Sequence, residues 1–264
     1  MMITIQKYVR AQSLEEAYVL NQSRRNRIIG GMLWLKMSTL NIATAIDLSG
    51  LGLDTIEETD DAFSIGAMVT LRQLEQHQGL NRYMNGAAAE AVSSIVGVQF
   101  RNMATVGGSL WGRFGFSDVL TLFLAADSYV ELYKGGVVPL AQFAAMKPDR
   151  DILVRLIVKK TSASFAYRSM RIQRTDFPVI TCAVSRVNDC FCASIGARPH
   201  KAILLRDDDG ILAGGITEES AAAFASSVAQ RCPTGGNLRG SAAYRTHLIR
   251  VLVKRAILAL GGNA

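Results

Sequence analysis

The chain is organised around the stretch RNMATVGGSL at residues 101–110, which ends in a glycine pair. A second glycine pair occurs earlier, in the stretch RIIGGML at residues 27–33. Each pair follows apolar or β-branched residues, so each predicts a strand that ends in a tight turn. Glycine accepts a positive φ, and successive N–H groups in such a turn can bind an anion such as a pyrophosphate. A glycine pair alone is far more often an ordinary turn than a ligand site, and it is the occurrence of two similar pairs that favours a ligand site.

The length and composition predict a globular protein of more than one unit. With 264 residues the chain exceeds the usual size of one core, so we expect two or three compact units. No apolar stretch is long enough to span a bilayer, and no signal-peptide pattern is present at the start, which predicts a cytoplasmic protein. The net charge of +7 is scattered, and its densest cluster is Arg24-Arg25-Asn26-Arg27. This pattern favours a solvated surface, or a docking face for an acidic partner, over nucleic-acid binding.

The sequence offers no catalytic side chains. The cysteines, Cys182, Cys190, Cys192 and Cys232, lack the spacing of zinc or iron–sulfur sites, and we expect small buried or half-buried thiols. The three histidines lie far apart, and neither G-x-G-x-x-G nor a P-loop occurs. The sequence therefore predicts no catalytic residue and no metal site in this chain. Any chemistry would come from a bound cofactor.

The predicted elements do not alternate strictly between strand and helix, which indicates an α+β fold. Capping boxes at Ser13 and Thr70 predict two helix starts. Apolar periodicity predicts helices at residues 82–96, 119–126, 217–230 and 241–260. Apolar runs predict strands at residues 28–29, 45–48, 62–69, 129–133, 152–158, 165–171 and 179–187. Asn188-Asp189 predicts a hairpin turn into residues 190–193.

These motifs, taken in order, resemble one family: the FAD-binding medium subunits of molybdenum hydroxylases, relatives of xanthine and carbon monoxide dehydrogenases. The second glycine stretch, with Asp118 ten residues after Gly108, is similar to the flavin-loop signature of that family. Three further stretches resemble other family segments in the same order: IGAMVTLRQL at residues 65–74, LAADSYVEL at 124–132 and LRGSAAYR at 238–245.

The resemblance implies a fold and a cofactor. The fold would be of the para-cresol methylhydroxylase type, with α+β FAD-binding lobes at residues 1–58 and 59–160. A sheet-and-helix domain of the CO dehydrogenase flavoprotein type would follow at residues 161–264. FAD would lie extended between the lobes, with its pyrophosphate touching both glycine loops.

The resemblance also implies which residues bind the cofactor. The first glycine loop would supply Ile28, Ile29, Gly30, Gly31, Met32 and Leu33, and the second would supply Thr105, Val106, Gly107, Gly108 and Ser109. Asp118 would contact ribose or ribityl hydroxyls, Leu153 would pack on the flavin, and Arg168 would lie near the isoalloxazine. Each of these three has a structural alternative: a first-turn helix acid, a core leucine and a solvated arginine, respectively.

The chain departs from the family at several of these positions. Met32 and Leu33 stand where relatives carry a hydroxyl and a polar residue, so a side-chain hydroxyl to the phosphate is lost. Ser109 replaces an asparagine, and Phe114-Gly115-Phe116 replaces a Ser-Pro-Ala stretch. These changes predict weaker FAD binding, or binding that depends on partner subunits.

The implied function is electron transfer in a xanthine dehydrogenase-like complex. A large subunit with molybdopterin would hydroxylate a purine, another heteroaromatic compound or an aldehyde. A small subunit with [2Fe-2S] clusters would pass electrons to FAD in this chain, and NAD+ or another acceptor would receive them. Two alternatives stand beside it: a stand-alone flavin oxidoreductase on the same fold, and a cofactor-free structural subunit.

Overall fold

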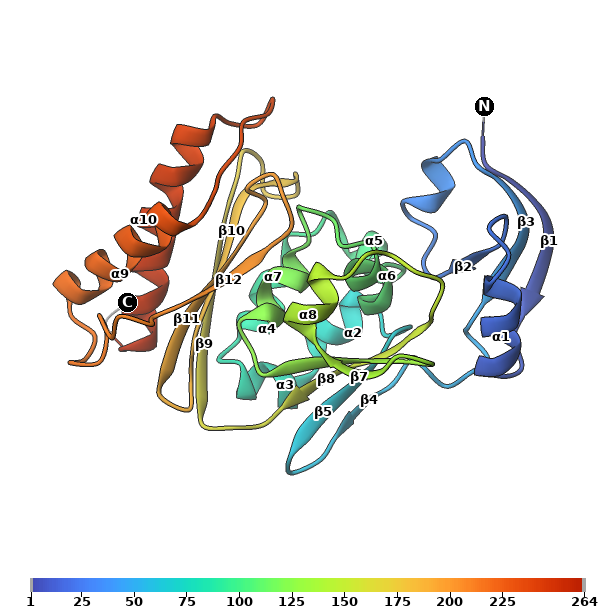
Figure 1. The fold of residues 1–264 in the computed structure, drawn as a ribbon, viewed down its shortest axis with the longest axis horizontal. Helices are drawn as coiled ribbons and strands as arrows, with labels where there is room; N and C mark the ends of the chain where they lie inside the picture. Colours follow the sequence, from blue (N-terminus) through green and yellow to red (C-terminus); the bar gives the residue numbers. More distant parts are fainter. Residues whose placement is uncertain (1, 263–264) are drawn as a thin grey trace.

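Three β-sheets follow one another along the long axis of the molecule in a computed structural model that describes residues 2–262 (Figure 1). The first sheet has the strand order β1-β3-β2 and is parallel. The second has the order β4-β5-β8-β6-β7 and the third the order β12-β11-β10-β9, and both are antiparallel. Helices pack beside these sheets, which confirms the predicted α+β class.

The first lobe is a small sheet with short helices. Its elements are β1 (Thr4–Arg10), α1 (Leu14–Asn21), β2 (Arg27–Ile29), the 3-10 helix η1 (Leu35–Met37) and β3 (Asn41–Asp47). Ser13 caps α1 by accepting a hydrogen bond from the Glu16 N–H. The Glu16 carboxylate accepts from Gln12 N–H rather than from Ser13, so the predicted capping box forms only in part.

The middle lobe holds the second sheet and most of the helices. Its strands are β4 (Ile56–Glu58), β5 (Ala62–Gly66), β6 (Ser128–Leu132), β7 (Gly136–Pro139) and β8 (Leu153–Lys159). Its helices are α2 (Leu71–Gln76), α3 (Gln78–Tyr83), α4 (Ala87–Ser93), α5 (Val98–Arg101), α6 (Val106–Trp111), α7 (Asp118–Leu124) and α8 (Leu140–Ala145). Because β4 pairs with β5, residues 56–58 belong to this sheet, although our expected boundary after residue 58 placed them in the first lobe.

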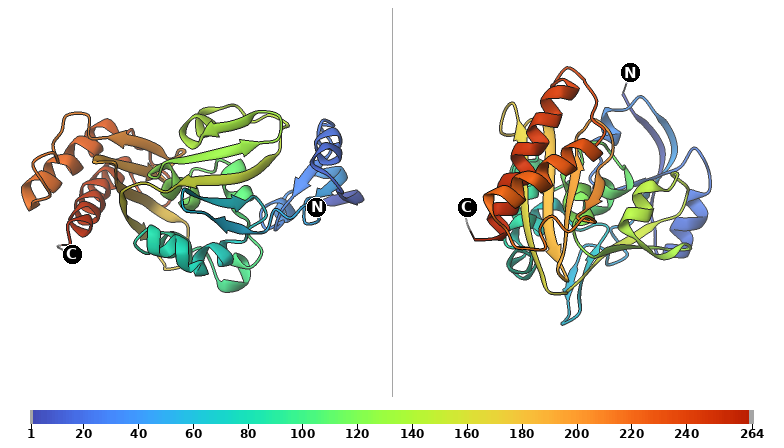
Figure 2. Two further views of the ribbon diagram at one scale, coloured as in Figure 1. Left: turned by 90° about the horizontal axis from the view of Figure 1, so that it is seen from below. Right: turned by 60° about the vertical axis from the view of Figure 1, so that its left-hand side comes forward.

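The C-terminal domain is a sheet covered on both faces (Figure 2). It comprises β9 (Ala163–Arg171), β10 (Pro178–Val187), β11 (Cys190–Gly196), β12 (Ile203–Arg206), α9 (Glu218–Arg231) and α10 (Ala242–Leu260). α10 packs on the outer face of this sheet together with α9, whereas α4 and α7 of the middle lobe pack on its inner face. The predicted hairpin at Asn188-Asp189 is present, with Val187 paired to Cys190. Cys182, Cys192 and Cys232 are buried and Cys190 is exposed.

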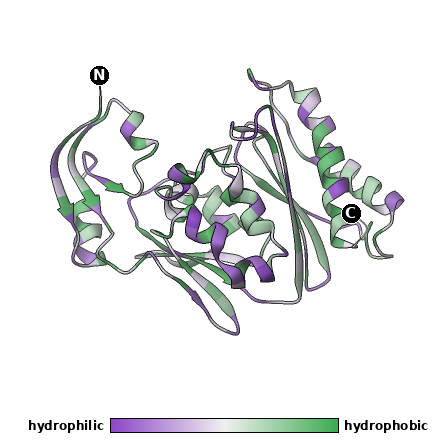
Figure 3. Cartoon of the chain, turned by 180° about the vertical axis from the view of Figure 1, so that it is seen from behind, coloured by the Kyte–Doolittle hydropathy of each residue, from purple (hydrophilic) through white to green (hydrophobic). Residues whose placement is uncertain are grey.

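Alternation along β9 separates two hydrophobic cores. Tyr167 and Phe165 point inward to the core shared with the middle lobe, whereas Ala166 points outward to the core under α9 and α10. The hydrophobic stripe of α10 that covers this outer core is visible in Figure 3. A third, smaller core joins the first lobe to Ile152 and Val154 of the middle lobe. Among residues 2–262, no helix combines the length and the hydropathy that a bilayer span requires.

Candidate functional site

The two glycine stretches meet at the seam between the first and middle lobes. A Cβ on Gly31 would lie 1.8 Å from the Met103 carbonyl oxygen, and a Cβ on Gly30 would lie 2.8 Å from Thr105 Oγ1. On the other side, a Cβ on Gly107 would lie 2.6 Å from the Ala67 carbonyl oxygen. These glycines are therefore needed for close contact of protein with protein: Gly30 and Gly31 bring the two lobes together, whereas Gly107 packs against Ala67 within the middle lobe.

The first loop, Gly30–Leu33, contains an unusual backbone conformation. Its two glycines do not have positive φ values; the left-handed residue is Met32, with φ 62°. The expectation that glycine supplies the positive φ here is therefore wrong. A left-handed non-glycine residue costs about 1–2 kcal/mol, so the first loop holds local backbone strain of the kind that clusters at binding sites.

The N–H groups of the first loop have no acceptor in the protein. Gly30, Gly31, Met32 and Leu33 donate no hydrogen bond to any atom of residues 2–262, whereas the Met32 carbonyl accepts one from the Lys36 N–H at 2.9 Å. Successive N–H donors beside a left-handed residue form a concave nest suited to an anion. The first loop therefore fits the phosphate-binding role that the sequence predicted.

The second loop, Thr105–Ser109, differs from the prediction, because it opens helix α6 rather than forming a turn after a strand. Its N–H groups are already paired: Val106 donates to Val69 at 2.8 Å and Gly107 to Ala67 at 2.8 Å. Gly108 and Ser109 donate to Thr105, at 3.1 Å to Oγ1 and 3.0 Å to the carbonyl oxygen. The second loop can therefore line a ligand site, but its backbone is not an open anion cradle.

Two cavities lie on either side of this contact. Cavity A has a volume of about 610 Å³ and cavity B about 280 Å³. Both are bordered by the residues at which the loops meet, namely Arg27, Ile28, Gly30, Thr105, Gly108 and Trp111. Cavity A adds Gly31, Met32, Leu33, Ser109 and Asp118, and cavity B adds Ile29, Gly107 and Leu153. Val106 borders neither cavity and is buried in the middle-lobe core.

Aromatic rings from all three units surround cavity A. Trp34 follows the first loop, and its ring centroid lies 5.5 Å from those of Phe116 in the middle lobe and Phe177 in the C-terminal domain. Phe114 and Phe116, from the segment that departs from the family, stack on one another at 5.1 Å. Flat, apolar walls of this kind suit a planar ring system.

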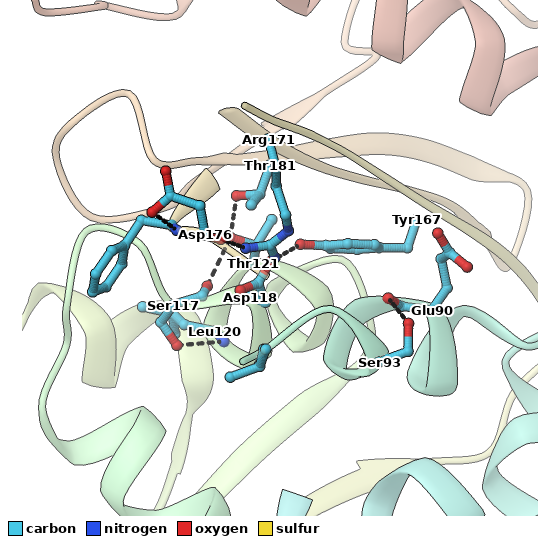
Figure 4. Close-up of polar contacts among 12 residues, drawn as sticks. Glu90, Ser93, Ser117, Asp118, Leu120, Thr121, Tyr167, Arg171, Asp176 and Thr181 are labelled. Atoms are coloured by element: carbon cyan, nitrogen blue, oxygen red, sulfur yellow. Dashed lines mark hydrogen bonds and ion pairs between the residues drawn. The ribbon is translucent and has the colours of Figure 1, made fainter. Parts of the chain in front are cut away.

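Asp118 joins the wall of cavity A to the C-terminal domain (Figure 4). Its Oδ1 accepts a hydrogen bond from the Tyr167 hydroxyl at 2.5 Å and pairs with Arg171 Nη2 at 2.5 Å. Asp118 is also the first residue of α7, after the N-cap Ser117, so the helix N-terminus favours a carboxylate there. Burial raises the pKa of Asp118 against the opposing effect of Arg171, and burial likewise raises that of Tyr167. The contacts of Asp118 with Tyr167 and Arg171 hold β9 against α7. The predicted contact of Asp118 with ribose or ribityl hydroxyls of FAD stays a prediction.

The structure does not bring Arg168 to either cavity. In the register of β9 and β10, Arg168 lies opposite Cys182. The Arg168 Nη1 donates to the Tyr167 carbonyl oxygen at 2.9 Å. Because side chains alternate along a strand, Arg171 shares the face of Tyr167, and it is Arg171 that borders cavity A. The family motifs did not point to Arg171, although the side-chain alternation of a strand over residues 165–171 places it on the opposite face from Arg168.

Comparison with known families identifies the class of the protein. Residues 3–161 match the FAD binding domain in molybdopterin dehydrogenase, and residues 165–260 match the CO dehydrogenase flavoprotein C-terminal domain. The chain therefore belongs to this FAD-binding family of oxidoreductase components, which confirms the resemblance drawn from the motifs and the FAD-binding domain that it implied.

Individual relatives match over nearly the whole chain. The Escherichia coli (strain K12) protein YgfM is 27% identical over 255 residues, covering 94% of each chain. The nicotine 6-hydroxylase medium subunit of Paenarthrobacter nicotinovorans is 24% identical over 278 residues, covering 97% of this chain and 98% of that one. A structure of carbon monoxide dehydrogenase from Hydrogenophaga pseudoflava superposes with a TM-score of 0.87 at 23% identity, covering 100% of both chains.

Proposed function

We propose that this chain is the FAD-bearing electron-transfer subunit of a xanthine dehydrogenase-like molybdenum hydroxylase. The observation that carries the proposal is the open N–H run of Gly30–Leu33 at the point where cavities A and B meet. FAD has a planar ring system at each end and a diphosphate between them. The site offers a cavity for each ring system and an anion cradle between the cavities.

The chain's own part in the reaction is to bind and orient. When bound, FAD would supply a group that takes up electrons singly, as iron–sulfur clusters give them, and can release them as a pair. The N–H groups of the first loop hold the diphosphate, and the walls of the two cavities exclude water from the rings. The pair Asp118–Arg171 fixes one wall of cavity A. The proposal assigns no catalytic side chain to this chain.

The partners are proposed from the relatives. The Paenarthrobacter relative is a medium subunit, which supports a complex with a large molybdopterin subunit and a small [2Fe-2S] subunit. We propose NAD+ as the acceptor of the electrons. We also retain the division into two FAD-binding lobes and a C-terminal domain, with the first boundary placed before β4.

The test is the visible absorption spectrum of the purified full-length chain before and after addition of FAD. The proposal expects two absorption bands of oxidised flavin that stay with the protein on gel filtration and are released on denaturation. Protein that retains no flavin, alone and when co-purified with its partner subunits, would contradict the proposal.

A cofactor-free structural subunit is the second candidate, and two observations favour it. The N–H groups of Val106 to Ser109 are all paired within the protein, and Met32 and Leu33 carry no hydroxyl for a phosphate. A cofactor-free subunit would show no flavin absorption, either as the purified chain or when co-purified with its partner subunits. The spectrum of the co-purified complex therefore separates the two functions.

A further inference from the structure

Three arginines converge on the first-lobe side of the seam. Arg24 and Arg27 flank the turn that precedes β2, and Arg150 lies in the middle lobe just before β8. Arg150 reaches across the seam, where its Nη2 donates to the carbonyl oxygens of Ser23 and Asn26. Arg27 and Arg150 both border cavity B, and Arg27 also borders cavity A. We call Arg24, Arg27 and Arg150 the guanidinium cluster.

The guanidinium cluster has no counter-ion among residues 2–262, because every ion pair within 4.0 Å involves other residues. Two carboxylates border cavity B but are engaged elsewhere. Asp151 accepts from the N–H groups of Lys134, Gly135 and Ile152, and Asp149 accepts from the Asp151 N–H. Burial lowers the pKa of Arg150, and the positive charges of Arg27 and Arg24 lower it further. The guanidinium cluster therefore carries uncompensated like charge.

Several donors of the guanidinium cluster also lack an acceptor. Arg150 Nε is buried without a hydrogen-bond partner in the described part of the chain. Arg27 uses only Nη1, which donates to the carbonyl oxygens of Arg24 at 2.6 Å and Asn26 at 2.7 Å. A buried donor without a partner costs stability, and guanidinium groups recognise phosphate oxygens in pairs. Open donors and unbalanced positive charge together indicate a site for a phosphate group.

We propose that the guanidinium cluster binds the diphosphate of FAD from the side of cavity B and replaces the hydroxyl that the first loop lacks. This inference rests on the proposed function. Arg27 lies three residues before Gly30, about 10 Å along the extended strand, and it borders both of the cavities that Gly30 borders. The diphosphate would then be held by neutral donors on one side and by positive charge on the other.

A structural role of the same arginines is the competing explanation, because Arg150 already ties the lobes together through carbonyl oxygens. The two explanations differ in their ligand dependence. A phosphate contact strengthens the binding of FAD but does not change the affinity for riboflavin, because riboflavin has no phosphate. A purely structural tie would affect both ligands alike.

The experiment measures the dissociation constants of FAD and riboflavin by equilibrium dialysis with the full-length chain. Arg150→Gln should weaken FAD about tenfold, the size of one charge-assisted hydrogen bond, and Arg24→Gln about threefold, the size of a weaker charge contact. Arg25→Gln is the matched control, because Arg25 is exposed, borders neither cavity and, unlike Arg24, is not among the charges that lower the pKa of Arg150. This variant should leave the FAD affinity unchanged.

The affinity for riboflavin should be unchanged in all three variants. Added salt should weaken FAD binding less in Arg150→Gln than in the wild type, because the variant has lost one charge contact.

Two results would overturn the inference while FAD binding itself stands. One is a wild-type FAD affinity in both Arg150→Gln and Arg24→Gln; the other is an equal loss of FAD and riboflavin affinity. A third result is also informative: the wild-type chain binds inorganic pyrophosphate but no FAD, and Arg150→Gln no longer binds pyrophosphate. This result would support an anion site at the guanidinium cluster. That same result would refute the proposed function, so the two failures are distinguishable.

Discussion

At Gly31 the need for glycine comes from a neighbouring backbone rather than from a ligand, since a Cβ there would lie 1.8 Å from the Met103 carbonyl oxygen. Gly108 differs, because its Cβ would meet only Thr105 Oγ1, at 3.0 Å. We therefore expect Gly31→Ala to lower the free energy of unfolding by about 2–4 kcal/mol, and Gly108→Ala by less than about 1 kcal/mol. Urea denaturation of the two variants measures the difference.

Gly108→Ala is the control, because alanine also favours the helix in which Gly108 lies. Equal losses of stability in the two variants would show that the contact between Gly31 and Met103 is not the cause.

Residue identity drew attention to both glycine stretches but did not predict their geometry. The first glycine pair contacts Met103 and Thr105 of the second stretch, whereas FAD binding by these residues stays a prediction. The sequence could not show that Met32 takes the positive φ, because that conformation depends on how the loop rests on Met103. Nor could it show that the N–H groups of Val106 and Gly107 are paired, since their acceptors lie on Val69 and Ala67, about forty residues earlier. Arg171 is a different case, because the alternation of side chains along β9 is a local pattern that separates it from Arg168 without any knowledge of the fold.

At the scale of elements, Glu75 joins α2 to α5. Its carboxylate pairs with Arg101 Nε at 2.8 Å and Arg72 Nη1 at 2.9 Å, and its side chain is 14% exposed. Burial acts to raise the pKa of Glu75, but hydrogen bonds from Arg101 and Arg72 outweigh it, so the pKa is lowered overall. A lowered carboxyl pKa contributes stability above the unfolded pKa, and this contribution is lost as the pH falls through the folded pKa.

We therefore expect Glu75→Gln to lower the free energy of unfolding by about 1–3 kcal/mol at neutral pH. The difference from the wild type should shrink once the pH falls below about 4.3, the ordinary value for glutamate. Urea titrations at a series of pH values test this. A difference that is constant across the acid range would mean that the charge of Glu75 is not what stabilises the contact.

Helix starts were the elements best predicted from sequence. The N-caps Thr70, Ser117 and Ser241 each accept a hydrogen bond from the N–H three residues on, because this interaction is local. The helix predicted over 82–96 is broken where Asn85 and Gly86 both have positive φ. β1 was not predicted, because its residues are mostly exposed and lack an apolar alternation. Its place in the sheet comes from pairing with β3, which is more than thirty residues away.

At the scale of the whole molecule, the first lobe rests on the other units along a seam that contains both cavities. Besides the small core around Ile152 and Val154, the seam includes the glycine contact, the Arg150 bridge, the ring of Trp34 and the ion pair between Glu15 and Lys134. A ligand that fills both cavities would add contacts along this line. The stability of the first lobe should therefore depend on FAD more than that of the C-terminal domain does.

We expect saturating FAD to slow amide hydrogen exchange most at residues 27–38, with little change in α9 and α10. At a concentration one hundred times the dissociation constant, FAD should add about 2.7 kcal/mol to the free energy of unfolding. Exchange mass spectrometry with and without FAD makes the comparison. Protection spread evenly over the chain, or none at residues 27–38, would contradict the placement of FAD at the seam.

Trp34 and Trp111 are the two tryptophans of the sequence, and both border cavity A. Trp111 also borders cavity B, whereas Trp34 borders cavity A alone. A ring system that enters cavity A will therefore change the emission of both indoles, whereas pyrophosphate bound beside Arg150 reaches only the side of the site that Trp111 shares. The chain thus carries an intrinsic optical reporter, with no label attached, in which the emission of Trp34 follows occupation of the ring site.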